Sequence, residues 1–300
     1  MPDIGFLNSG SKAEFTHLLN AFRDGLKQQG YKVVSSAPKG AKELRINAVW
    51  AGGDYSQLPD KAKALFTKDV KVIAATGGIG AAHAVQSHAT ATGSKVPIVF
   101  TSGRDAPKPG DLTANAKAVH LGMSTAQIQN HNRYKRLCDL LSPNANIYVL
   151  INKNTPVHSE EGSWPRPLSA STVAELKAAF ATAARDKADA LLVSGDPIFN
   201  SRRSEIVQLA NKHKIPVCYP WREYVEAGGL MSHGPNLARV YRRLGVWVGM
   251  ILDGGTMAAK DLPDMGAGHR EFVVNLKTAK KLNIPPATLA KLLLMADEVI

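Results

Sequence analysis

The residues with the clearest chemical potential in this sequence are glycines that follow an apolar run. Residues 72–80 read VIAATGGIG, and a helical pattern begins at once after the turn. A glycine turn at the start of a helix exposes backbone N–H groups, and the helix dipole favours an anion at this end. The turn therefore predicts a binding site for a phosphate or a carboxylate, formed by Gly77, Gly78, Ile79 and Gly80.

The glycine turn does not match the common nucleotide-binding motifs. The dinucleotide pattern G-x-G-x-x-G would place Gly or Ala at the position of His83, and no Gly-Lys-Ser/Thr sequence ends the loop as in a Walker motif. The turn suits a carboxylate at least as well as a phosphate.

Two other loops in the first half carry small polar residues directly after an apolar run. One precedes a helical pattern, where Ser and Asn are preferred N-caps, so we expect capping there and, in addition, ligand contact. The loops comprise Asn8, Ser9, Gly10 and Ser11 in the first case and Thr101, Ser102 and Gly103 in the second.

The loops of the second half are more charged and carry aromatic rings. Asp196 follows an apolar run and precedes a proline, where it could accept hydrogen bonds from a ligand ammonium group or, alternatively, cap the helix from residue 201. Aromatic residues nearby could line an apolar pocket or pack in the core. The candidate ligand-binding residues of this half are Asn152, Asn154, Asp196, Phe199, Trp221, Arg222 and Glu223. The first half thus offers hydrogen-bond donors for an anion, and the second half offers a carboxylate and aromatic rings. A zwitterion with an apolar side chain would fit this division.

Familiar catalytic and metal-binding motifs are not found in the sequence. It contains no G-x-S-x-G, H-E-x-x-H or C-x-x-C. His83 and His88 are five positions apart, so they do not share a helix face and make a poor metal pair. We therefore expect a protein that is not an enzyme and that uses no metal and no cofactor.

Apolar strand-like runs alternate with helical patterns along the chain and must position these loops. Such alternation predicts an α/β fold with parallel sheets covered on both faces. A polar connector at residues 110–123 separates two series of units, so we expect two doubly wound lobes with ligand loops at the carboxyl ends of their strands. The predicted strands cover residues 4–8, 43–50, 70–76, 97–101, 146–152, 190–194, 217–220 and 272–276, and the predicted helices cover residues 12–29, 55–67, 79–91, 124–141, 169–186, 201–213, 236–252 and 277–282.

Length and composition agree with a two-lobed globular chain. The 300 residues are 44% hydrophobic and 21% charged, with no apolar stretch long enough to span a membrane. The formal net charge is +12, but the basic residues are spread along the chain, which does not favour nucleic-acid binding. The N-terminus lacks the basic and apolar parts of an export signal, so we expect either a cytoplasmic protein or an exported one whose signal is absent from this sequence.

At these loops the sequence resembles the substrate-binding proteins of ABC transporters, a family related to tryptophan and tyrosine binders. The resemblance extends over nearly the whole chain and is most specific in the second half. The segments that carry it are IGFLNSGS, VWAGGDYSQLP, VIAATGGIGAAHA and VPIVFTSGRD in the first half, and GDPIFNSRR, PWREYVEAGGLMSHGP and NLKTAKKLNIPP in the second.

This resemblance implies a type I periplasmic binding protein: two α/β lobes that are joined by a hinge and close on a small ligand. The lobes would comprise residues 1–117 with 236–258 and residues 118–235 with 259–300. It also implies a monomer that delivers its ligand to a membrane permease without chemistry. The location would be periplasmic, or extracytoplasmic with a lipid anchor.

The sequence departs from the family pattern around the expected pocket. Residues 102–110 read SGRDAPKPG where relatives commonly read GGDPVKxG, His233 stands where Tyr is usual, and residues 157–168 form an unusual segment with Trp164. The ligand therefore remains open between an amino acid and an aromatic or branched carboxylate. The alternative function is a cytoplasmic enzyme or small-molecule sensor on the same fold.

Overall fold

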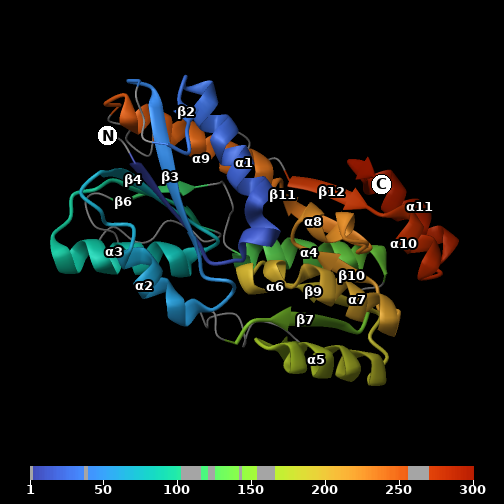
Figure 1. Cartoon of the computed structure of the whole chain (residues 1–300). Helices are drawn as coiled ribbons and strands as arrows, with labels where there is room; N and C mark the ends of the chain where they lie inside the picture. The colour runs from blue at the N-terminus through green and yellow to red at the C-terminus, as the bar shows by residue number, and fades with distance from the viewer. Residues whose placement is uncertain are drawn as a thin grey trace. The chain divides into compact units, whose positions relative to one another are not determined.

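The chain folds into two compact units, each built on its own sheet. The computed structural model describes residues 3–36, 40–102, 116–120, 126–141, 144–153, 166–255 and 270–300 (Figure 1). Unit 1 comprises Met1–Met123 with Leu237–Ala267, and unit 2 comprises Ser124–Asn236 with Gly268–Ile300. The chain therefore passes from one unit to the other three times.

Unit 1 contains a six-stranded sheet with the strand order β2-β3-β1-β4-β5-β6, and every neighbouring pair runs parallel. Connections between parallel strands need crossovers, and helices supply the ones that follow β1, β3 and β4. The strands are β1 (Asp3–Asn8), β2 (Lys32–Val33), β3 (Glu43–Trp50), β4 (Val70–Thr76), β5 (Ile98–Ser102) and β6 (Ala116–His120); the helices are α1 (Lys12–Gln28), the 3-10 helix η1 (Tyr55–Gln57), α2 (Leu58–Lys63), α3 (Ile79–Thr92) and α9 (Leu237–Leu252).

Helices cover both faces of this sheet. On one face Leu7 and Phe100 pack in a buried cluster with residues of α2 and α3. On the other face Phe6 contacts Phe22 of α1 and Tyr241 of α9, with ring centroids 5.4 and 6.4 Å apart. Successive side chains of a strand point to opposite faces, so Phe6 and Leu7 separate the two layers.

Helices α1 and α9 pack closely because glycines stand at their contact. A Cβ atom at Gly25 would lie 1.8 Å from the carbonyl oxygen of Arg242, and one at Gly245 would lie 2.0 Å from that of Phe22. Any side chain at either position would force the two helices apart. This contact holds the returning segment, α9, in unit 1.

Unit 2 contains a seven-stranded sheet with the order β13-β12-β11-β10-β9-β7-β8. The pair β11–β12 is antiparallel, and the other pairs are parallel. The strands are β7 (Ile147–Ile151), β8 (Pro167–Ser169), β9 (Ala190–Val193), β10 (Val217–Tyr219), β11 (Met231–Pro235), β12 (Arg270–Val274) and β13 (Glu298–Val299); the helices are α4 (Ala126–Leu140), α5 (Val173–Arg185), α6 (Pro197–Ser201), α7 (Arg203–His213), α8 (Arg222–Glu226), α10 (Leu276–Lys281) and α11 (Pro286–Met295).

The faces of this sheet are also covered. Leu137 of α4 and Leu292 of α11 join one buried cluster with Val149 of β7. Tyr148 points the other way, and its hydroxyl donates a 3.0 Å hydrogen bond to Asp186 at the end of α5. A capping box between Thr172 and Glu175 fixes the start of α5.

The α/β class with two sheets of mainly parallel strands is confirmed. The short strands β2, β6, β8, β11 and β13 are not among the predicted ones. β11 has the sequence MSHGP, in which glycine and proline hide the strand pattern, and its antiparallel partner β12 departs from the expected all-parallel sheets. In the part of the chain that the structure describes, no helix is long and apolar enough to cross a membrane.

Candidate functional site

In unit 1 the candidate loops meet where the strand order reverses. The chain continues from β1 towards β3 and from β4 towards β5, which lie on opposite sides of the β1–β4 pair. Asn8 and Thr76 are partners in the register of β1 and β4, so the two following loops begin at the same level. Ligands of open α/β sheets bind at such a reversal, outside the carboxyl ends of the strands. The structure thus brings residues 8–11 and residues 77–80 together, while their contact with a ligand stays a prediction.

Asn8 holds these loops in place through its side chain. Its Nδ2 donates to the hydroxyls of Thr76 and Tyr241, each at 2.9 Å, and its Oδ1 accepts the backbone N–H of Gly10 at 2.7 Å. Because these bonds occupy both amide hydrogens, Asn8 acts as a positioning residue in this state. Its direct contact with a ligand remains a prediction.

Gly77 permits the close approach of the two loops. Its φ of 76° lies in the left-handed region, and a Cβ atom there would lie 2.7 Å from the backbone nitrogen of Ser9. The backbone N–H of Ser9 in turn donates to the carbonyl of Thr76 at 3.3 Å. Glycine is required at this position because a side chain would push the first loop away from the second.

Two features leave hydrogen-bond donors available at these loops. Among the residues with described positions, the Ser9 hydroxyl is fully buried and has no hydrogen-bond partner. Within the same set, no side chain caps the N-terminus of α3, which begins at Ile79 after Gly78 with a φ of 97°. Ser11 differs, because its hydroxyl caps α1 by accepting the N–H of Glu14 at 3.3 Å. Ser9 and the first turn of α3 are therefore the candidate donors for an anion, and their contact with a ligand stays a prediction.

Four other predicted positions, three in unit 1 and one in unit 2, lie at the edge of the described residues or outside them. Thr101 is buried at the end of β5, beside β4, and Ser102 is described only as part of that strand. Gly103 and Asn154 lie outside the described residues, as do residues 157–165 of the unusual segment with Trp164.

In unit 2 the strand order reverses between β7 and β9. The chain goes from β7 to β8 on one side and from β9 to β10 on the other. Asn152 follows β7 and is buried, and Ser194 follows β9, with its N–H bound to the carbonyl of Leu150 at 3.0 Å. Asn152, Asp196 and Phe199 therefore occupy the loops that this reversal predicts to be functional.

Asp196 is only 3% exposed and caps a short helix. Its Oδ1 accepts the N–H of Ile198 at 2.8 Å, at the start of α6. Asp196 thus caps a helix, as one of the two expectations had it, but this helix comprises residues 197–201 and is not the expected one from residue 201. A carboxylate can cap through one oxygen and still accept further bonds, so a role in binding an ammonium group stays a prediction.

Aromatic rings surround the loops after β9 and β10. Phe199 is fully buried and Trp221 is almost fully buried, while Tyr224 stacks on Tyr219 with ring centroids 4.8 Å apart. Trp221 lies 6.4 Å from Tyr224 and also faces Gly195, where a Cβ atom would be 3.5 Å from the indole ring. Burial raises the pKa of Tyr224 well above its ordinary value, with the nearby charge of Asp196 adding to the effect, so this hydroxyl stays protonated.

Polar atoms are buried among these rings. The side-chain amide of Asn200, the indole N–H of Trp221 and the hydroxyl of Tyr224 have no hydrogen-bond partner among the residues that the structure describes. Tyr224 is one of the aromatic residues that we expected either to line a pocket or to pack in the core, whereas Asn200 is not a predicted site residue. The position of Asn200 in the GDPIFNSRR segment was the only sequence signal that pointed to it.

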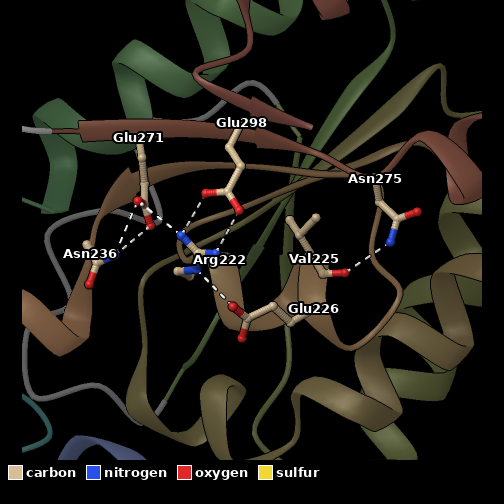
Figure 2. Close-up of polar contacts among 7 residues, drawn as sticks. All are labelled: Arg222, Val225, Glu226, Asn236, Glu271, Asn275 and Glu298. Carbon is tan, nitrogen blue, oxygen red and sulfur yellow. Dashed lines mark hydrogen bonds and ion pairs between the residues drawn. The ribbon is translucent and has the colours of Figure 1, made fainter. Parts of the chain in front are cut away.

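Arg222 makes its contacts within unit 2. Its guanidinium binds Glu226 at 2.8 Å, Glu298 at 3.0 Å and Glu271 at 3.3 Å, and Asn236 donates to the same Glu271 (Figure 2). Hydrogen bonds to Glu298 and Glu226 raise the pKa of Arg222 above its already high value. This network joins α8 to β12 and β13, so ligand binding by Arg222 remains a prediction without support in its contacts.

Glu223 is buried on α8 next to Trp221, with 5% of its surface exposed. Its role in binding an ammonium group is also untested. No group of three or more His, Cys, Asp or Glu residues in the described ranges is placed to hold a metal ion.

A family model matches the second part of the chain, which includes loops of unit 2 described above. Residues 165–300 match the family model described as "ABC transporter substrate binding protein". No curated protein matches the chain. The match covers less than half of the sequence and includes the loops after β9 and β10.

Solved structures match over nearly the whole chain at low sequence identity. A Streptococcus pneumoniae ABC domain in complex with L-Trp has a TM-score of 0.73 at 21% identity, covering 99% of this chain and 100% of that one. A conserved domain protein from Vibrio cholerae has a TM-score of 0.74 at 20% identity, covering 100% and 99%. A branched-chain amino acid transporter substrate binding protein from Streptococcus pneumoniae, in complex with isoleucine, has a TM-score of 0.58 at 13% identity, covering 87% and 86%.

These comparisons confirm the resemblance to ABC transporter substrate-binding proteins that the sequence suggested. They also confirm the fold as that of type I periplasmic binding proteins.

Proposed function

We propose that this chain is the solute-binding component of an ABC importer. It captures a small carboxylate ligand, an amino acid or an aromatic or branched acid, by closure of its two units. It then delivers the ligand, unchanged, to a membrane permease. It acts outside the cytoplasm, in the periplasm or held by a lipid anchor, as a monomer.

The observation that carries this proposal is the pair of loops at the β1–β4 reversal of unit 1. Ser9 offers a buried hydroxyl without a partner among the described residues, and α3 starts beside it without a side-chain cap. Backbone N–H groups in the first turn of a helix, together with the helix dipole, stabilise a carboxylate. We assign the ligand carboxylate to this place.

The loops of unit 2 would receive the rest of the ligand. Asp196 is buried and acidic, so it would pair with the ammonium group of an amino acid. Trp221 and Phe199 would contact the side chain. Solved neighbours in complex with L-Trp, with isoleucine and with benzoate support a ligand of this size and charge.

A thermal-shift screen of amino acids and aromatic acids tests the function directly. A ligand that binds only the folded state raises the melting temperature, by an amount that grows with its concentration. Compounds that stabilise the protein are then titrated by calorimetry and recovered afterwards for mass spectrometry. We expect at least one carboxylate to bind and to be recovered unchanged. Turnover of the bound compound, or the absence of any stabilising carboxylate, would contradict the proposal.

A further inference from the structure

Several buried polar groups in unit 2 lack hydrogen-bond partners among the residues that the structure describes, and three of them follow strands β9 and β10. These three belong to Asn200, Trp221 and Tyr224, which we call the orphan cluster, and each of these residues is at least nine-tenths buried. Other polar side chains of the unit are paired: Thr278 donates to the carbonyl of Gly228 at 3.0 Å, and Asn275 donates to that of Val225 at 3.2 Å (Figure 2). The hydroxyl of Ser232 is buried without a partner in the described ranges, as the three groups are. Buried polar groups in native proteins are nearly always paired, so an unpaired cluster needs an explanation.

The members of the orphan cluster lie around Asp196. The backbone N–H of Asn200 donates to the carbonyl of Asp196 at 3.0 Å. The Trp221 ring faces Gly195 and lies 6.4 Å from the ring of Tyr224. The charge of Asp196 adds to the rise in the pKa of the Tyr224 hydroxyl. Asn200 lies on α6, Tyr224 lies on α8, and Trp221 directly precedes α8; these helices follow the neighbouring strands β9 and β10 (Figure 1).

The chemistry of these groups limits what can satisfy them. The indole N–H is a donor only, the amide of Asn200 is a donor and an acceptor, and the Tyr224 hydroxyl can be either. A hydrocarbon side chain placed here would leave these groups unpaired, whereas a hydroxyl or carbonyl oxygen can accept a hydrogen bond from the indole N–H or from the amide of Asn200. Sites with buried polar groups discriminate strongly against analogues that cannot pair with them.

We propose that the ligand carries an oxygen-bearing group, a hydroxyl or a carbonyl, at the end remote from its carboxylate, and that the orphan cluster recognises this oxygen. The inference rests on the proposed function and narrows its ligand class. It departs from the purely apolar side chain that the sequence suggested. Hydroxylated aromatic acids and hydroxylated amino acids are the expected ligands.

Calorimetry with matched pairs of compounds tests the ligand class. The pairs are tyrosine and phenylalanine, 4-hydroxybenzoate and benzoate, and threonine and valine. In the first two pairs one member carries an additional hydroxyl group, and in the third a hydroxyl group replaces a methyl group. We expect the oxygen-bearing member of at least one pair to bind about tenfold more tightly or better. Equal or tighter binding of the hydrocarbon members in every pair that binds would overturn the inference and leave the proposed function intact. If no member of any pair binds, the inference fails, and the thermal-shift screen of other carboxylates decides whether the proposed function fails with it.

The substitution Trp221→Phe removes the indole N–H and keeps an aromatic ring. In this variant the ratio of the affinities for the oxygen-bearing and the hydrocarbon member should fall towards one, mainly because the oxygen-bearing member binds more weakly. Trp247→Phe, the same change in α9 of unit 1, is the matched control and should retain the preference. An unchanged preference in Trp221→Phe would contradict the role of the indole.

The substitution Asn200→Leu adds a stability readout that a structural residue would not give. Because Asn200 has no side-chain bond to lose among the described residues, the ligand-free variant should melt at the same temperature as the wild type or higher. Its preference for oxygen-bearing ligands should nevertheless fall several-fold. A clear loss of thermal stability without ligand would show that Asn200 is paired in the fold and would overturn its assignment.

Discussion

Asn8 at the end of β1 donates a 2.9 Å hydrogen bond to the hydroxyl of Tyr241, 233 positions later on α9. Both side chains are buried in unit 1. The same asparagine accepts the N–H of Gly10, so the helix that returns to unit 1 helps to hold the loop on which we place the ligand carboxylate.

Removal of the Tyr241 hydroxyl should destabilise the protein. Tyr241→Phe leaves one amide hydrogen of Asn8 buried without a partner, which typically costs about 1–3 kcal/mol. Urea denaturation measures the change in the free energy of unfolding. Tyr224→Phe is the matched control, because this buried hydroxyl has no partner in the described ranges and its loss should be nearly neutral. Equal effects of the two changes would contradict the prediction.

Gly77→Ala should destabilise unit 1 more than Gly93→Ala. Both glycines have positive φ values, 76° and 64°, so both substitutions add backbone strain of about 1 kcal/mol. Only at Gly77 would the new Cβ atom meet the neighbouring loop, 2.7 Å from the Ser9 nitrogen, whereas Gly93 has no atom within 4 Å. Thermal melting compares the two, and ligand binding should weaken only in Gly77→Ala. Similar melting temperatures would show that the two loops do not depend on this close approach.

Asp196→Asn should weaken the binding of amino acids but leave the binding of acids without an ammonium group nearly unchanged. Asparagine keeps an oxygen that can cap α6, so the fold should survive, but the negative charge is lost. Binding of a ligand with an ammonium group should weaken about tenfold or more, since its positive charge is left unpaired. Binding of an acid without an ammonium group should change little. Calorimetry with one ligand of each kind measures both, and an unaltered affinity for the amino acid would remove Asp196 from the ammonium site.

The stability of the protein should fall in mildly acidic solution through His233. Burial lowers the pKa of this imidazole from 6.5 to about 4, with Arg136, Arg133 and Arg270 adding to the effect and Asp297 opposing it. Between these two values the unfolded chain binds a proton that the native protein does not. The contribution of His233 to stability is therefore complete above about pH 6.5 and is lost as the pH falls towards 4, by roughly 3 kcal/mol.

Urea denaturation at pH 7 and pH 4.5 checks this effect, with His233→Gln as the reference that cannot gain the proton. We expect the wild type to lose more stability between these pH values than the variant does, since all other titrating groups are shared. The same pH dependence in both proteins would show that the imidazole titrates normally in the native state.

Arg222 and Glu271 should show a measurable coupling in a double-mutant cycle. Their side chains are 23% and 20% exposed and lie 3.3 Å apart, within a network that includes Glu298 and Asn236 (Figure 2). Partly buried, networked ion pairs couple by about 1 kcal/mol, more than isolated surface pairs. The pair Arg185–Asp186, with the arginine 73% exposed, is the control and should couple by about 0.5 kcal/mol or less. Coupling energies of equal size would argue that the network adds nothing.

Much of the architecture could be predicted because its signals are local. The apolar runs of β1, β4 and β9 are continuous, and the glycine and serine residues after them have turn and cap preferences that act within a few positions. The short strands β8 and β11 escaped prediction because proline, glycine and their length carry no clear period. The orphan cluster escaped for another reason: nothing in the sequence shows whether a buried Asn200 finds a partner.

The sequence by itself determined the α/β class and the loops with anion-binding chemistry, because hydrophobic period and helix-start preferences depend on neighbours within one or two turns of chain. Only the tertiary structure decided that α9 packs on α1, that Tyr241 reaches Asn8, and that Arg222 is held by Glu226, Glu271 and Glu298. Contacts between segments tens to hundreds of positions apart depend on how whole helices and strands pack. No local preference specifies them.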